Sequence, residues 1–240
     1  MNVSKLTRAV RAALPLKYCG AVIVAAGNAS RMGGIDKVMA PLGGEPMIVH
    51  TVRAFQNCDA IREIVVVTRE DLLIPVMSLC HDFSKVQAVV AGGDNRQASV
   101  ARGIQALSPK ARLVAVQDGA RPLISCQVID RTVRAANTYG AAAPAIPVKD
   151  TVKAVAGGMV SHTPDRSTLQ AVQTPQVFDR DLLKGALKKA QRDGASITDD
   201  CSAVERLGMS VKIVEGDERN IKVTTPMDLK IAALLLEEEK

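Results

Sequence analysis

A run of small residues and two cations near the start of the chain could bind phosphate groups. The segment Ala25-Ala26-Gly27-Asn28-Ala29-Ser30-Arg31-Met32-Gly33 follows an apolar stretch, and Lys37 comes soon after it. A small-residue turn after a strand lets backbone N–H groups approach phosphate oxygens closely. Arg31 and Lys37 can then neutralise the charge of a triphosphate. The length of this loop, its glycines and its paired cations favour a binding role over an ordinary surface loop.

Two familiar phosphate-binding motifs do not fit this segment. A Walker A loop requires Gly-Lys followed by Ser or Thr at the start of a helix, whereas Lys37 is followed by Val38. A dinucleotide-binding fingerprint requires a helix directly after the glycines and an acidic residue at the end of the next strand. Here no helical pattern begins before Pro46, and the second apolar run ends in Thr68-Arg69.

A carboxylate follows another apolar run, in the segment Asp118-Gly-Ala-Arg121-Pro. In open α/β sheets ligands bind at the carboxyl ends of the strands. A carboxylate at that place can hold Mg²⁺, with phosphate oxygens and waters completing the coordination shell. Because Asp-Gly also starts many turns, the residues alone leave a metal site and a simple turn equally open.

Three further polar segments could contribute to the same site. Gly93, Asp94 and Ser99 lie in a strand-to-helix loop that could recognise a base or ribose, although Asp94 also suits a helix N-cap. Thr198 is expected to cap a helix, and helix N-termini attract anions. Lys222 lies in a strand-like run, where a charge needs either water or a partner such as a phosphate.

The elements that would position these residues alternate between short apolar runs and helical patterns. The runs predict strands at residues 20–26, 63–68, 86–91, 112–117 and 141–146. The patterns between them predict helices at residues 46–57, 71–80, 94–107 and 125–139, the last capped by Ser125 and ended by Gly140. Repeated β-α-β units imply a parallel sheet with helices on both faces.

The alternation breaks at residues 147–165, where Gly157-Gly158 separates two strand-like segments. This pattern predicts a hairpin, which we interpret as an arm that projects from the sheet. In the last third we expect strands at residues 169–178, 211–214 and 221–223, and helices at 179–193, 198–208 and 226–236.

The fold class is therefore α/β, a Rossmann-like three-layer sandwich with a mostly parallel central sheet and a projecting β-arm. We expect one domain over residues 19–240, with the arm at about 147–166, preceded by an N-terminal extension at residues 1–18. That extension holds four basic residues and no acidic one. We interpret it as a short surface helix, and a transit peptide is the alternative.

Composition excludes several classes of protein. The formal net charge is +6, yet the sequence has no Trp, two Tyr and three Phe, so it lacks the stacking aromatics typical of nucleic-acid-binding proteins. Its apolar runs are shorter than the ~20 residues that a membrane span requires. Five scattered cysteines without a C-x-x-C pair favour a reducing compartment, and we expect the cytoplasm.

Taken together, the polar segments resemble those of one family, the 2-C-methyl-D-erythritol 4-phosphate cytidylyltransferases. The resemblance extends from about Ala21 to Leu235. The segments that carry it are AAGNASRMG, GGDNRQAS, DGARP, PVKDTVK, DRSTLQAVQTPQVF, ITDDCSAVE and VEGDERNIKVTTP. Each is common by itself, and their combination is specific.

The resemblance implies a Mg²⁺-dependent transfer of CMP from CTP to 2-C-methyl-D-erythritol 4-phosphate, with release of pyrophosphate, in the non-mevalonate isoprenoid pathway. The implied catalytic residues are Arg31, Lys37 and Lys222. The implied nucleotide-binding residues are Ala25, Ala26, Gly27, Gly93, Asp94 and Ser99. The implied substrate-binding residues are Asp118, which would also hold the metal, Arg121, Thr174, Thr198, Thr151 and Arg166. Thr151 and Arg166 would reach into the neighbouring subunit's site, so the resemblance also implies a homodimer formed through the arm.

The chain departs from the family pattern in the first loop. Ala29 stands where the family usually has a second glycine, and Asp36-Lys37-Val38 stands where it usually has Pro-Lys-Gln. An alanine methyl narrows the approach to the backbone, and Asp36 puts an anion beside Lys37. These changes keep open a non-catalytic nucleotide-binding regulator on the same fold. A ribitol-5-phosphate cytidylyltransferase is a second alternative, since it would share the nucleotide half and differ only in the arm and the final third. A nucleic-acid-binding module would rest only on the pI of about 9.2 and the basic start.

Overall fold

The computed structural model describes residues 15–27 and 37–238. At its centre lies β1 (Cys19–Ala25), which pairs in parallel with β4 (Glu63–Thr68) on one side and with β6 (Leu113–Asp118) on the other. β5 (Val86–Ala91) extends the sheet in parallel beyond β4. Every residue of β4 and β6 is buried, as expected for strands covered on both faces. These four strands confirm the first half of the predicted parallel sheet.

The second half of the sheet is mixed. β11 (Gln176–Asp179) lies between β6 and β7 (Ala141–Pro147) and runs antiparallel to both. β10 (Gln170–Val172) pairs with the far end of β7, and β12 (Lys212–Glu215) pairs with β7 in parallel. The main path through the sheet is β10-β7-β11-β6-β1-β4-β5. The sheet is therefore mostly parallel, and β10 and β11 are its two reversed strands.

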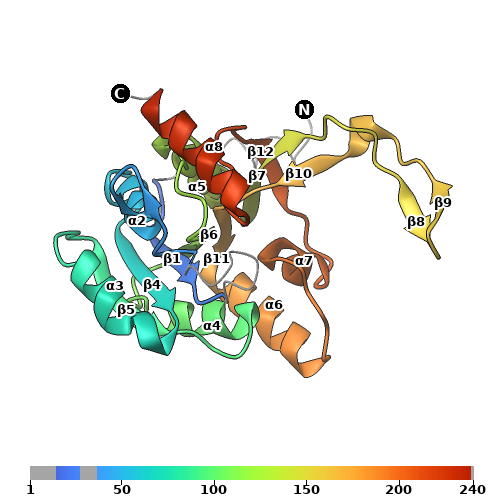
Figure 1. Ribbon diagram of the computed structural model, residues 1–240. Helices are drawn as coiled ribbons and strands as arrows, with labels where there is room; N and C mark the ends of the chain where they lie inside the picture. Colours follow the sequence, from blue (N-terminus) through green and yellow to red (C-terminus); the bar gives the residue numbers. More distant parts are fainter. Residues whose placement is uncertain (1–14, 28–36, 239–240) are drawn as a thin grey trace.

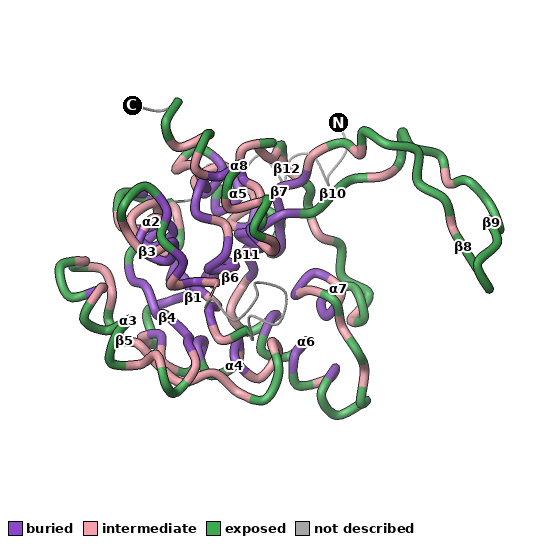
Figure 2. Tube along the Cα trace, viewed as in Figure 1, coloured by how far each residue is buried: buried purple, intermediate pink, exposed green. Residues whose placement is uncertain are grey.

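Helices cover both faces of this sheet (Figure 1). One layer consists of α2 (Met47–Gln56), α3 (Leu73–Leu79) and α5 (Cys126–Tyr139), and it packs on alternate residues such as Ile23 of β1. The other consists of α4 (Arg96–Ala106), α6 (Arg180–Arg192) and α7 (Asp200–Glu205), and it packs on the opposite residues, such as Val22. Figure 2 shows the buried residues concentrated along the central strands. The predicted three-layer arrangement is confirmed.

A smaller apolar cluster lies under the last helix, α8 (Pro226–Glu237). It joins Ala232 of α8 to Leu42, in the short β2 (Pro41–Leu42), and to Val223. β2 pairs with β3 (Glu45–Pro46), directly before α2. The strand predicted at residues 221–223 is wrong, because this segment is irregular and its apolar residues pack under α8 instead of joining the sheet.

Two predicted helix caps also need correction. Asn95, not Asp94, caps α4, since its side-chain oxygen accepts a hydrogen bond from the amide of Ala98 at 2.8 Å. Asp199, not Thr198, caps α7 by accepting from the amide of Ser202 at 2.9 Å.

The strand predicted at residues 169–178 is two strands, β10 and β11, separated at a cis Thr174-Pro175 bond. The described residues also form two short 3₁₀ helices, η1 (Glu70–Leu72) and η2 (Arg166–Thr168).

The predicted arm is present. β8 (Ala154–Ala156) and β9 (Met159–His162) form an antiparallel hairpin, and the two glycines between them have φ of 57° and 79°, which glycine adopts without strain. The hairpin extends away from the sheet beyond β7 and β10 (Figure 1). Among the described residues, no helix has the length and apolar character needed to cross a membrane.

Candidate active site

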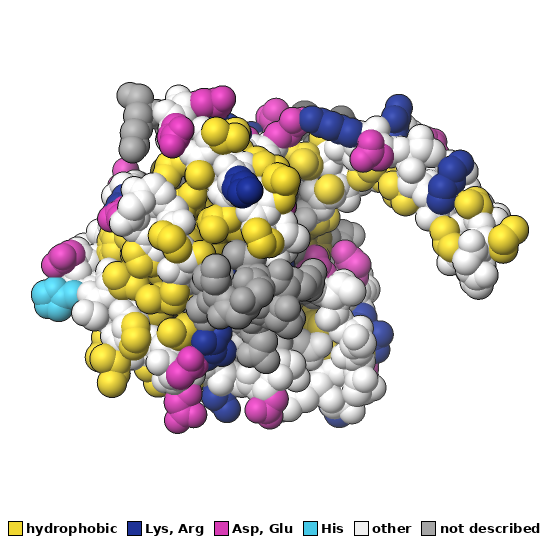
Figure 3. Space-filling model, in the orientation of Figure 1, with side chains coloured by type: hydrophobic (Ala, Val, Ile, Leu, Met, Phe, Trp, Pro, Cys, Tyr) yellow, Lys and Arg dark blue, Asp and Glu magenta, His cyan; other side chains and the backbone are white. Residues whose placement is uncertain are grey.

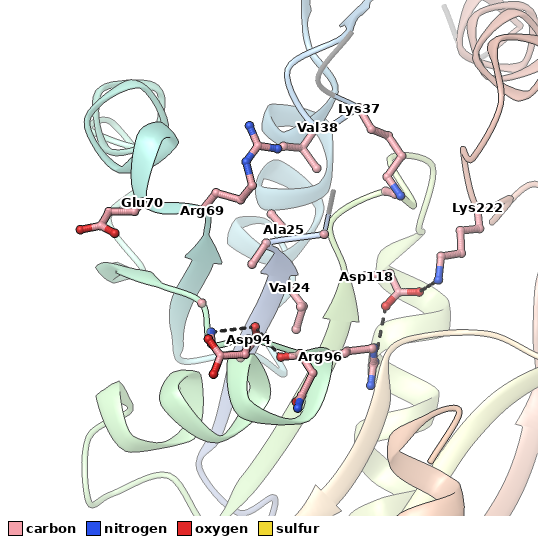
Figure 4. A pocket seen from close by; sticks show the side chains of 17 residues that line it. Val24, Ala25, Lys37, Val38, Arg69, Glu70, Asp94, Arg96, Asp118 and Lys222 are labelled. Carbon is pink, nitrogen blue, oxygen red and sulfur yellow. Dashed lines mark hydrogen bonds and ion pairs between the residues drawn. The ribbon is translucent and has the colours of Figure 1, made fainter. Parts of the chain in front are cut away.

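A cavity of about 490 Å³ opens at the carboxyl ends of β1, β4, β5 and β6 (Figure 4). The backbone of Ala25, Ala26 and Gly27, which follows β1, forms one wall, and Gly93 and Asp94, which follow β5, form the opposite wall. Lys37, Asp118, Ser99 and Lys222 also line it. Parallel strands bring their carboxyl ends to one edge of the sheet, so loops far apart in the sequence meet here.

The two walls touch through residues that have little or no side chain. A Cβ on Gly92 would lie 2.4 Å from Cβ of Ala26, and a Cβ on Gly93 would lie 2.4 Å from Cβ of Ala98. The amide of Gly93 donates to Oγ of Ser99 at 3.1 Å, and this hydroxyl donates to the carbonyl of Asn95. Positions 92 and 93 therefore have room only for glycine, and both glycines line the cavity with backbone atoms. Ala26, Gly93 and Ser99 thus line the same cavity, and their predicted contact with a nucleotide stays a prediction.

Asp118 is the central charged group of the cavity. Nζ of Lys222 lies 2.7 Å from Oδ2, and a terminal nitrogen of Arg96 lies 3.4 Å from Oδ1 (Figure 4). Burial favours the protonated form, but Lys222 and then Arg96 outweigh it, so the pKa of Asp118 is lowered. The amide of Asp118 donates to Oγ1 of Thr174 at 3.1 Å. Lys222 thus has a carboxylate partner, and Asp118 stays ionised.

Sequence reasoning missed Arg96 and Asp200. Asp200 is completely buried at the start of α7, and its Oδ2 lies 2.8 Å from Nη1 of Arg96. Burial opposes the charge of Arg96, but Asp200 and Asp118 together raise its pKa above the usual value. Arg96 lies in the segment GGDNRQAS and Asp200 in ITDDCSAVE. In both segments the sequence pattern predicts a helix cap at a neighbouring residue and no role for these two. The pairing joins distant segments, and no local pattern in the sequence predicts it.

A buried polar network fixes the loop that carries Lys222. The side-chain amide of Asn220 donates to the carbonyl of Thr174 at 2.9 Å. The side chain of Gln173 bonds both the carbonyl and the amide of Asp217, at 2.7 and 3.2 Å. Arg121 donates to the carbonyl of Asn220, and burial lowers the pKa of this guanidinium. Thr174 and Arg121 therefore lie behind Asp118, where they support it and its neighbour Lys222.

The remaining predicted residues lie elsewhere. Thr198 is exposed beside the α7 cap and is not among the residues that line the cavity. Thr151 and Arg166 are exposed on the arm, where Arg166 donates to the carbonyl of Lys149 at 2.8 Å. The structure does not bring these two residues to the cavity of their own chain. Arg31 lies outside the described residues.

The acidic side chains that line the cavity are Asp118, Asp94 and Glu70. Across residues 15–27 and 37–238, no group of three or more His, Cys, Asp or Glu side chains could hold a metal ion. Mg²⁺ often binds through one carboxylate, with substrate phosphates and waters as its other ligands. The single buried carboxylate of Asp118 suits that mode.

Comparison with known proteins gives the family. The family model described as 2-C-methyl-D-erythritol 4-phosphate cytidylyltransferase matches residues 19–238. The chain belongs to this family. A relative of that name in Symbiobacterium thermophilum is 46% identical over 91% of this chain and 92% of its own length. One of the same name in Caldanaerobacter subterraneus is 43% identical over 90% of this chain and 97% of its own.

Solved structures of cytidylyltransferases in this family have the same fold. The 4-diphosphocytidyl-2C-methyl-D-erythritol synthase of Anaerococcus prevotii superposes with a TM-score of 0.84 at 31% identity, covering 92% of this chain and 96% of its own. The 2-C-methyl-D-erythritol 4-phosphate cytidylyltransferase of Thermus thermophilus gives 0.76 at 34%, with coverage of 90% and 98%.

Proposed function

We propose that this protein transfers CMP from CTP to 2-C-methyl-D-erythritol 4-phosphate and releases pyrophosphate, forming 4-diphosphocytidyl-2-C-methyl-D-erythritol. Membership of the cytidylyltransferase family supports this reaction. The observation that carries the proposal is the cavity itself, where loop backbones from Ala25–Gly27 and Gly93 face Lys37, Lys222 and Asp118. Backbone amides and cations that converge on one cavity suit a ligand with several linked phosphates.

The chemistry requires positioning and charge stabilisation more than proton transfer. An oxygen of the acceptor phosphate attacks the α-phosphorus of CTP, a new P–O bond forms, and the bond to the β-phosphate oxygen breaks. Because the attacking phosphate is already anionic, no general base is needed. Lys37 and Lys222 stabilise charge that develops on the phosphoryl groups, and the loop backbones orient the nucleotide. Arg31 is proposed to act beside Lys37.

We propose Mg²⁺ as the cofactor, held by Asp118 together with phosphate oxygens and waters. When bound, the ion neutralises charge on the phosphates and on the departing pyrophosphate. Asp118 suits this role because Lys222 and Arg96 keep it ionised inside a largely buried wall. The proposal also assigns Gly93, Asp94 and Ser99 to the base and ribose, and Arg121 and Thr174 to the support of Asp118 beside the acceptor. Thr198, which does not line the cavity, would contact the acceptor only where the acceptor extends beyond that cavity.

We propose further that two copies associate through the arm. Its hairpin exposes Val155, Met159 and Val160 by 60%, 75% and 59%, and these apolar side chains gather near its tip (Figure 3). A projecting hairpin with such a surface favours burial against another protein. In a homodimer, Thr151 and Arg166 would then contact the acceptor in the partner's cavity. The five cysteines are free, in keeping with a reducing compartment such as the cytoplasm.

Pyrophosphate release tests the function. The purified protein is incubated with Mg²⁺, CTP and either 2-C-methyl-D-erythritol 4-phosphate or ribitol 5-phosphate, with ATP, GTP and UTP in place of CTP as controls. We expect release with CTP and the methylerythritol acceptor. Release with ribitol 5-phosphate alone would make the protein the sibling enzyme. CTP binding without release from either acceptor would make it a non-catalytic regulator.

A further inference from the structure

Asp200 is a buried carboxylate that the proposed reaction does not use. It has no solvent exposure, and burial raises its pKa even though Arg96 opposes this shift. Within the described part of the chain, Arg96 is the only cation recorded at ion-pairing distance, and neither oxygen of Asp200 accepts a separate hydrogen bond. A buried charge lowers the free energy of unfolding unless an opposite charge and hydrogen bonds compensate for the lost solvation. Asp200 therefore depends on Arg96 for this compensation.

Arg96 shares its guanidinium group between two carboxylates. One terminal nitrogen lies 2.8 Å from Asp200, and the other lies 3.4 Å from Asp118. The closer contact is therefore with the carboxylate that lies outside the cavity. Asp118 receives only a long contact from Arg96 at Oδ1, although guanidinium and carboxylate groups readily form short paired bonds.

We propose that Asp200 is a positioning residue that holds Arg96 back from Asp118, so that Asp118 can bind a divalent cation. Without the charge of Asp200, Asp118 is the nearest carboxylate that the structure records for Arg96. The guanidinium group then moves onto Asp118 and competes with the metal for its oxygens. Groups that bond a metal ligand directly typically change metal affinity by about 10- to 100-fold. Asp200 acts on Asp118 through such a group, Arg96.

The inference rests on the proposed role of Asp118 as the metal ligand, so the test measures metal and nucleotide binding without turnover. Mn²⁺ replaces Mg²⁺, and no acceptor is added. Water-proton relaxation, which changes when Mn²⁺·CTP binds to a large molecule, gives the affinity for the complex. Calorimetry with CTP and a chelator gives the affinity for the metal-free nucleotide. The ratio of the two affinities reports the contribution of the metal.

For Asp200→Asn, we expect affinity for Mn²⁺·CTP to fall about tenfold or more, while affinity for metal-free CTP changes less than about twofold. A merely structural role would lower both affinities together. Asp199→Asn is the matched control, because Asp199 is the adjacent carboxylate and caps α7 without contacting Arg96. It should lower the melting temperature and leave the ratio unchanged.

A second pair of variants covers the case in which Asp200→Asn does not fold. Replacing both members of a buried ion pair with uncharged residues leaves no unpaired charge. In an Arg96→Met background, Asp200→Asn should leave the ratio unchanged, since Asp200 acts through Arg96. A further fall in the ratio in that background would overturn the inference, and so would an unchanged ratio in Asp200→Asn alone. If Asp118→Asn leaves Mn²⁺·CTP binding intact, the proposed metal site itself is wrong.

Discussion

Gly103 lies on the face of α4 that packs on the sheet, and Gly103→Ala tests how closely this helix is fitted. A Cβ at this position would lie 2.3 Å from Cγ1 of Val22 and 2.9 Å from Cγ2 of Val67. Both valines are completely buried in central strands, so they have little room to move. Overpacking of this kind costs about 3 kcal/mol at the upper end of the usual range. The higher helix propensity of alanine returns about 1 kcal/mol. We therefore expect a net loss of about 2 kcal/mol in the free energy of unfolding.

Gly185 provides a matched control in α6. It also lies inside a helix, but a Cβ there would meet no atom within 4 Å. Only the propensity difference applies, so Gly185→Ala should stabilise the protein by about 1 kcal/mol. The two variants should therefore differ by about 3 kcal/mol, which urea unfolding measures readily.

The same substitution should reach the cavity. α4 carries Ser99 and Arg96 on its first turns, and both line the cavity, so a displaced helix moves that wall of the cavity. We expect Gly103→Ala to weaken CTP binding and Gly185→Ala to leave it unchanged, as measured by calorimetry. If Gly103→Ala is as stable as the wild type and binds CTP normally, then the packing of α4 does not position the site.

Other variants test the charges and the arm. Lys222→Gln should lower turnover by ~10²–10³, because it removes an ammonium group from the cavity. Lys189→Gln, on the surface of α6, is the control and should leave turnover unchanged. Normal pyrophosphate release by Lys222→Gln would show that Lys222 has no part in the mechanism. Burial favours the protonated form of Asp228, but hydrogen bonds from the residues before α8 outweigh it and lower its pKa. Its stabilising effect is therefore complete above the unfolded pKa of about 4 and is lost as pH falls through the lower folded value. Urea midpoints should show Asp228→Asn destabilised by about 1 kcal/mol at neutral pH, with a gap that narrows in acid; a gap that does not change with pH would contradict the shift. Val155→Asp combined with Met159→Asp should convert a dimer to monomers in analytical ultracentrifugation, and an unchanged sedimentation coefficient would show that the arm does not mediate association.

Much of the sheet could be predicted because strands buried on both faces are continuous apolar runs. The segments that form β1, β4 and β6 are of this kind, and each was located to within a residue or two. Gly140 was also a reliable signal, since its φ of 86° is the left-handed conformation that ends a helix. The first half of the fold follows directly from such local patterns.

Errors arose where one pattern fits two environments. Val223 is apolar because it packs under α8 and not because it lies in a strand. Asp94 and Asn95 are adjacent capping residues, and only the position of the first helical turn decides between them. The pairing of Arg96 with Asp200 depends on how α4 and α7 meet on the sheet, which local sequence does not encode. Arg31 stays a prediction, outside the described residues.

The position of β11 has a consequence for synthesis on the ribosome. This strand separates β6 from β7, so the sheet cannot reach its final order while the exit tunnel still holds residues 176–179. Until then the nascent chain exposes an edge of β6, which is an open template for wrong strand pairing. Lys222 emerges later still, so Asp118 lacks its closest counter-ion until translation is nearly complete. A fragment released early would therefore carry Asp118 and the loops after β1 and β5 without the ammonium group that pairs with this carboxylate.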